Sequence, residues 1–134
     1  MVIRARRYVC RPCGAVLLVV PSGVIGGRLF SAAAIGLALV LFGVCGLSMA
    51  ETRSRVSPWR HVGETAGLSW LSLRRWVCAV RERRLFACVR PSPARFTARQ
   101  VAERAALTLS ALAPTALADD RIEARVFAGA VAAG

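Results

Sequence analysis

The stretch that decides the fold is an uncharged segment at residues 31–50, with the sequence SAAAIGLALVLFGVCGLSMA. Twenty apolar residues are enough to cross a membrane as one helix. Signals inside the stretch favour a shorter, buried helix instead. Ser31 is a good N-cap, and Gly43 and Gly46 are typical of the end of a helix. We therefore expect a core helix over about residues 32–45.

The end of the same stretch predicts a second helix. Ser48 and Glu51 have the spacing of a capping box, in which each side chain accepts a hydrogen bond from the other residue's backbone. This helix would begin at Met49 and end before Pro58. A helix, a turn with glycine and a second helix outline a helix-turn-helix unit, which is a common DNA-binding motif.

Two alternatives to the buried helix remain open. One is a transmembrane helix over residues 31–50 with its basic flanks on anionic lipid, as in a small single-pass protein of the inner membrane. The other is a signal sequence, because Ser48 and Ala50 precede Glu51 with the spacing of a cleavage site. We favour the buried helix and a cytoplasmic location.

The charge of the chain is concentrated on either side of the apolar stretch. The 134 residues carry 19 basic and 7 acidic side chains, all the basic ones being Arg, and yet 56% of the residues are hydrophobic. This hydrophobic content excludes a disordered chain, and the length suits one domain or two very small ones. Residues 51–99 hold eleven Arg and three Glu, whereas residues 100–134 are close to neutral. The basic excess favours a polyanionic partner, with nucleic acid first and a membrane surface as the alternative.

A second helical pair is predicted over residues 62–80. Gly67 would lie in the turn and Ser69 would cap the following helix. Four apolar residues of that helix share one stripe at helical spacing: Leu73, Trp76, Val77 and Val80. The arginines beside the stripe would face outward.

We expect the DNA contacts to come from arginines on these helices, because a guanidinium binds phosphate or guanine in a bidentate manner. The candidate residues are Arg53, Arg55, Arg60, Arg74, Arg75 and Arg81. One His and a few scattered carboxylates do not form a catalytic constellation. The protein is therefore predicted not to be an enzyme, and no small-molecule substrate is evident.

The N-terminal cysteines predict a β-hairpin. Residues 7–9 have the pattern of a strand that enters Cys10-x-x-Cys13-Gly14, and residues 15–20 would form the returning strand. Such a turn aims two thiolates at one metal and is typical of half a zinc ribbon, whereas a closed zinc site takes four ligands. Zinc is thus expected only as a half site, at Cys10 and Cys13. Cys45 and Cys78 lie among apolar residues and are expected to be core thiols.

The C-terminal third predicts further helices. Thr97 and Gln100 form a second capping box, which would begin a helix over about residues 98–112 that Pro114 ends. A last short helix is expected over about residues 119–132. The polar residues expected to face solvent on the longer helix are Arg99, Glu103 and Arg104.

The sequence thus predicts a mainly α protein in three parts. Residues 1–28 would form the half zinc-ribbon hairpin, residues 29–90 a small helical bundle with helix-turn-helix units, and residues 91–134 the C-terminal helices. Partial disorder of the last part is an open alternative.

Four runs of the sequence resemble a known group of bacterial proteins. They are RRYVCRPCGA at 6–15, SAAAI at 31–35, RVSPWR at 55–60 and LRRW at 73–76. The group looks like the N-terminal DNA-recognition part of transposases, a zinc ribbon followed by helix-turn-helix segments. The resemblance covers about residues 3–90 and implies a non-enzymatic DNA-binding protein of the mobile-element type.

The chain departs from this group at its N-terminus. Such proteins usually carry a first Cys-x-x-Cys pair before the strand that here directly follows Met1. Our hypothesis is an N-terminally truncated member or a start assigned too late, which puts zinc binding by this chain in doubt. A decayed fragment without function is the remaining alternative.

Overall fold

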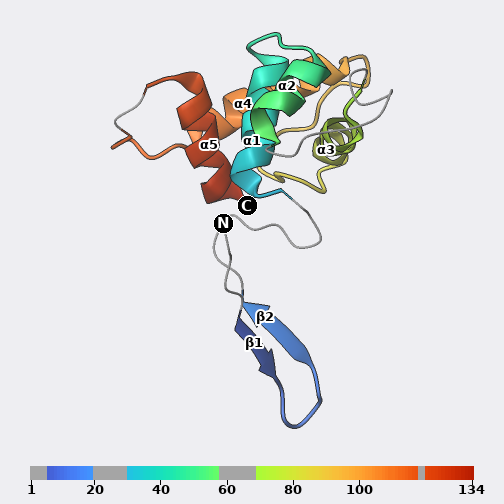
Figure 1. Ribbon diagram of the computed structural model, residues 1–134, viewed down its shortest axis with the longest axis vertical. Coiled ribbons are helices and arrows are strands. Elements are labelled where there is room, and N and C mark those ends of the chain that lie inside the picture. Colours follow the sequence, from blue (N-terminus) through green and yellow to red (C-terminus); the bar gives the residue numbers. More distant parts are fainter. Residues whose placement is uncertain (1–5, 20–29, 58–68, 118–119) are drawn as a thin grey trace.

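The computed structural model describes residues 6–19, 30–57, 69–117 and 120–134, and over these the protein is mainly helical, as the sequence predicts (Figure 1). Arg60 and the first helix of the second predicted pair lie outside the described residues. The described elements are β1 (Arg6–Val9), β2 (Val16–Val19), α1 (Ala32–Gly43), α2 (Met49–Val56), α3 (Leu71–Arg81), α4 (Ala98–Ala111) and α5 (Ile122–Ala133).

Helix α1 is the buried centre of the helical part. Ser31 caps it as predicted, because its Oγ accepts a hydrogen bond from the N–H of Ala34 at 3.2 Å. The helix contacts α2, α3, α4 and α5, so its side chains are apolar all round rather than on one stripe. The helix ends at Gly43, and residues 31–50 are therefore not one continuous helix. No helix in the described parts of the chain is long and apolar enough to cross a membrane.

Two glycines let α1 approach its neighbours closely. A Cβ on Gly36 would lie 2.6 Å from the Cβ of Ala130 in α5. A Cβ on Gly43 would overlap the backbone nitrogen of Glu103 in α4. Both crossings therefore require a residue without a side chain on α1.

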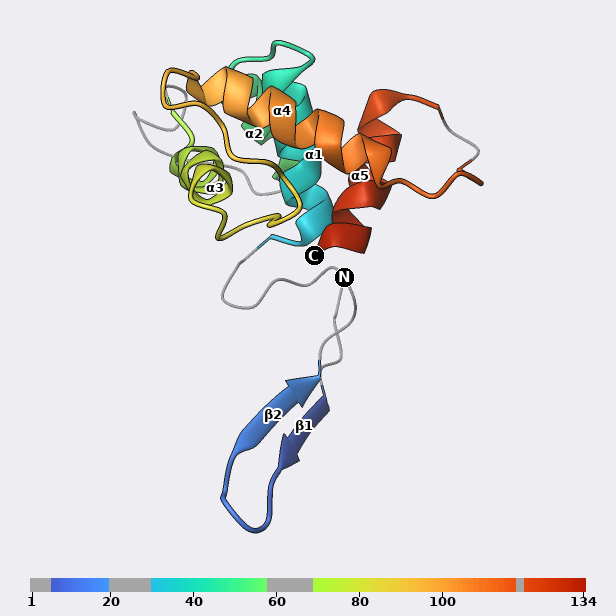
Figure 2. The ribbon, with the colours of Figure 1, turned by 180° about the vertical axis from the view of Figure 1, so that it is seen from behind.

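A glycine also allows the close packing of α4 against α5. A Cβ on Gly129 of α5 would overlap the carbonyl oxygen of Leu109 in α4. Each of the three pairs formed by α1, α4 and α5 thus has a glycine at its point of closest approach. Figure 2 shows these helices crossing side by side, with α3 at the opposite edge of the helical part from α5.

The second helix begins as the sequence predicts. The Oγ of Ser48 accepts a hydrogen bond from the N–H of Glu51, and the Glu51 carboxylate accepts one from the N–H of Ser48 at 2.8 Å. These hydrogen bonds from Ser48 lower the pKa of Glu51. Gly46, in the turn between α1 and α2, has a φ of +73°, a conformation that favours glycine.

Helix α4 also begins at its predicted capping box, but one of its arginines does not face solvent. Arg99 donates hydrogen bonds to the carbonyl oxygens of Phe42 and Leu47, and its guanidinium lies 4.3 Å from the centre of the Phe42 ring. The expectation of a solvent-facing Arg99 is therefore wrong. A cation is favourable here because the carbonyls at the carboxyl end of α1 lack partners within their own helix.

Helix α3 packs through its predicted stripe, with Leu73, Trp76, Val77 and Val80 buried. Trp70, Trp76 and Phe30 stack edge to face with ring centres 5.0–5.8 Å apart. Trp70 is buried in this cluster and keeps an extended backbone, with φ −120° and ψ 98°. The helix consequently begins at Leu71, and the prediction that Ser69 caps it is wrong.

Replacing Gly43 with Ala is expected to lower the free energy of unfolding by about 1–3 kcal/mol, the usual cost of overpacking. The reason is that α1 and α4 must separate to admit the Cβ. At an open helical position the same change stabilises by about 1 kcal/mol. Urea unfolding followed by circular dichroism measures the difference.

The control is Gly46, where a Cβ has no neighbour within 4 Å. Replacing Gly46 with Ala or with Leu should lower the free energy of unfolding by the same amount, because only the backbone conformation is strained there. At Gly43 the free energy of unfolding should fall further for Val than for Ala, because the larger side chain meets α4. A more stable Gly43→Ala protein would contradict the close helix crossing.

Candidate nucleic-acid interface

The side of α3 opposite its buried stripe is basic and exposed. Arg74, Arg75 and Arg81 are all exposed, and so is Cys78. At 100° per residue the four positions fall within an arc of about 120° that has Cys78 near its middle. Arg81 also donates a hydrogen bond to the carbonyl oxygen of Phe96, just before α4. Three of the six predicted arginines thus share one helix face.

The chain that follows α3 adds four exposed arginines beyond the six predicted from the sequence: Arg83, Arg84, Arg90 and Arg95. The one carboxylate among them, Glu82, accepts a hydrogen bond from Nε of Arg84 at 2.7 Å. Leu85, Phe86 and Val89 are buried and hold this segment against the core. The high density of Arg in residues 51–99 is the one feature of the sequence that points to these four residues.

We call residues 74–95 the basic segment. It holds seven exposed Arg and one Glu, a net charge of +6. Its backbone is fixed by the buried side chains of α3 and of the following turn. Such an arrangement presents several guanidinium groups on a rigid support, which suits the binding of a phosphate chain.

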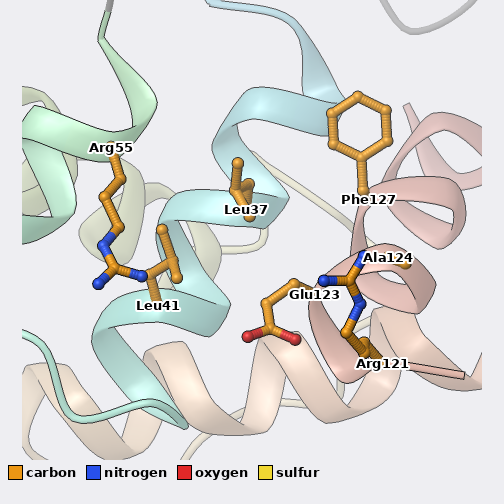
Figure 3. A pocket seen from close by; sticks show the side chains of 7 residues that line it. All are labelled: Leu37, Leu41, Arg55, Arg121, Glu123, Ala124 and Phe127. Atoms are coloured by element: carbon orange, nitrogen blue, oxygen red, sulfur yellow. The ribbon is translucent and has the colours of Figure 1, made fainter. Parts of the chain in front are cut away.

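The arginines of α2 lie elsewhere. Arg55 is exposed and lines a shallow groove with Leu37 and Leu41 of α1 and with Glu123 and Phe127 of α5 (Figure 3). The guanidinium of Arg55 lies over the α1 side of this groove. Arg53 is half-buried on the same helix. Helix α2 is therefore a poorer support for phosphate contacts than α3.

The two cysteines expected in the core are exposed, so this prediction is wrong. Cys45 follows the end of α1 and lies in the turn, and Cys78 projects from α3 on the side away from the buried Val77. The Cys45 thiol lies 3.7 Å from Oε1 of Glu123 and donates to it. Partial burial and the charge of Glu123 raise the pKa of Cys45.

The predicted hairpin is present, with Val9 paired to Val16 across two antiparallel strands. At its tip the N–H of Gly14 donates to the carbonyl of Cys10, and the N–H of Cys10 donates to the carbonyl of Ala15, each at 2.8 Å. Gly14 has a φ of +69°, as a tight turn requires.

The thiols at this tip lie close together. Hydrogen bonding from the Ala15 backbone and from the Cys10 thiol lowers the pKa of the Cys13 thiol. Two adjacent thiols of this kind fit two of the four positions of tetrahedral zinc. Within the described parts of the chain, no group of three or more His, Cys, Asp or Glu side chains is placed to hold a metal.

Comparisons with protein-family models, with curated proteins and with solved structures found no match to this chain.

The raised pKa of Cys45 predicts a difference in reactivity. In the Glu123→Gln variant the pKa should fall, because the thiol loses a negative neighbour, and the thiolate fraction at a given pH should rise. Alkylation of Cys45 by iodoacetamide at pH 8 should therefore be faster than in the unmodified protein, as measured for each peptide by mass spectrometry. Cys88 serves as the internal control. An unchanged rate at Cys45 would contradict the contact with Glu123.

Proposed function

We propose that the protein is a non-enzymatic DNA-binding protein that binds the duplex through the basic segment. The observation that carries the proposal is the charge of this segment, seven exposed Arg against one Glu on a fixed backbone. A duplex carries one negative charge for about each 1.7 Å of its axis, so neighbouring guanidinium groups contact neighbouring phosphates and release counterions.

The dimensions of α3 suit the major groove. A helix with its side chains is about 10–12 Å across and the major groove is about 12 Å wide, so the eleven residues of α3 can lie in the groove. Arg74 and Arg75 lie on the exposed face beside Cys78, and Arg81 lies near the end of the helix. Arg74 and Arg75 contact phosphate in this proposal, as do most of the other arginines of the basic segment.

The proposal also gives roles to the individual helices and to the hairpin. We take α3 as the recognition helix of a helix-turn-helix unit, and α1 and α2 as a second pair joined through the Gly46 turn. The half zinc ribbon and the resemblance to the recognition part of transposases agree with this function. Within the proposal Arg55 has a minor role, because it lines the groove beside α5.

Replacing Arg74 and Arg75 together with Gln is expected to weaken duplex binding about tenfold and to reduce the salt slope of log K by about 2, one for each phosphate contact. Both side chains are exposed, so the fold should be unchanged by circular dichroism. Fluorescence anisotropy of a labelled 20-base-pair duplex gives the affinity.

The matched control is Arg121→Gln, which removes an exposed arginine beside α5, at the opposite edge of the helical part. Its affinity should stay within about twofold of the unmodified protein at the same salt concentration. The α3 variant removes two charges and the control one, so equal losses of binding free energy per arginine removed would show an effect of net charge alone and would contradict binding by α3.

Cys78 provides a test without substitution. Because it lies among the arginines of the exposed face, bound DNA should cover it and slow its alkylation, whereas Cys45 at the end of α1 should react at the same rate with and without DNA. Peptide mass spectrometry separates the two sites. Protection of Cys45 instead of Cys78 would place the DNA on the other side of the protein.

A further inference from the structure

The hairpin tip presents an incomplete metal site. Cys13 is exposed and Cys10 is partly exposed, and the turn is closed by the two backbone hydrogen bonds around Gly14. The other cysteines that the structure describes lie in the helical part, at the end of α1, on α3 and after α3: Cys45, Cys78 and Cys88. A closed zinc site needs two ligands beyond the pair at the tip.

The strands beside this tip expose apolar surface. Tyr8, Val9 and Val16 are 50%, 60% and 50% exposed. Val9 and Val16 are paired across the strands and share one face of the hairpin. In both views the hairpin lies beyond the helices, with its tip pointing away from them (Figures 1 and 2). A two-stranded hairpin is only marginally stable alone in water, so a covering partner would stabilise it.

We propose that two copies of the chain join at their hairpin tips and share one zinc ion, held by Cys10 and Cys13 of both copies. The same patch meets itself about a two-fold axis, and four thiols complete the tetrahedron that one copy leaves half filled. The apolar side chains beside the two tips cover one another. In this arrangement the two missing ligands come from the Cys10 and Cys13 thiols of the second copy.

The charges of such a site balance locally. Binding of Zn²⁺ by four thiols releases four protons and leaves four thiolates with a net charge of −2. Arg11 is exposed and lies between the two cysteines of each tip. Two copies therefore place two guanidinium groups beside the site, and their charge of +2 balances its net charge of −2. The inference uses only the hairpin and does not depend on DNA binding.

The test measures zinc content and molecular mass together on the 134-residue chain, prepared with a phosphine reductant and added zinc. We expect one zinc ion for two chains and a dimer by native mass spectrometry, with monomers after chelation. Cys13→Ser should lose both the zinc and the dimer while its helical circular dichroism is kept. Cys78→Ser, the matched control, should behave as the unmodified protein.

Three results would overturn the inference: one zinc ion per monomer, a dimer that survives chelation, or no zinc bound at micromolar concentrations. A negative result for the zinc-linked dimer can be distinguished from a negative result for DNA binding. The zinc-free Cys13→Ser monomer should still bind duplex DNA, and its affinity should still depend on Arg74 and Arg75.

Discussion

The close crossing of α1, α4 and α5 is the constraint on which the rest of the structure depends. At each crossing a glycine faces the neighbouring helix: Gly36, Gly43 and Gly129. Because the neighbouring helices pack this closely, most of α1 is buried and its apolar side chains form the centre of the core. The end of α1 at Gly43 then fixes where the chain turns, where α2 begins and where Arg99 finds carbonyl partners.

The apolar and basic characters of the chain are separated by this arrangement. The apolar excess lies in the crossing helices, whereas the arginines are concentrated on α3 and the chain after it, at the edge of the helical part (Figure 2). Trp70, Trp76 and Phe30 anchor α3 through its opposite side. The basic segment thus carries +6 of the net charge of +12, on a surface separate from the buried apolar faces of the crossing helices.

The sequence predicts best what depends on neighbouring residues. Both capping boxes, the hairpin turn and the apolar stripe of α3 are local patterns, and the structure contains all of them. Contacts between distant residues were missed: Arg99 meets Phe42 across 57 residues, and Cys45 meets Glu123 across 78. The late start of α3 was missed because tertiary burial of Trp70 overrides the local capping signal of Ser69. The arginines after α3 were not predicted as DNA contacts, because their exposure depends on how the following turn packs against the core.

The central claim is that the basic segment binds the phosphates of duplex DNA, and the most direct measurement is the affinity as a function of salt concentration. With about four phosphates contacted, log K should fall linearly with log salt at a slope of about −3.6, which is a loss of about 150-fold in affinity between 50 and 200 mM. An affinity that does not change with salt, or no binding at micromolar protein, would contradict the claim.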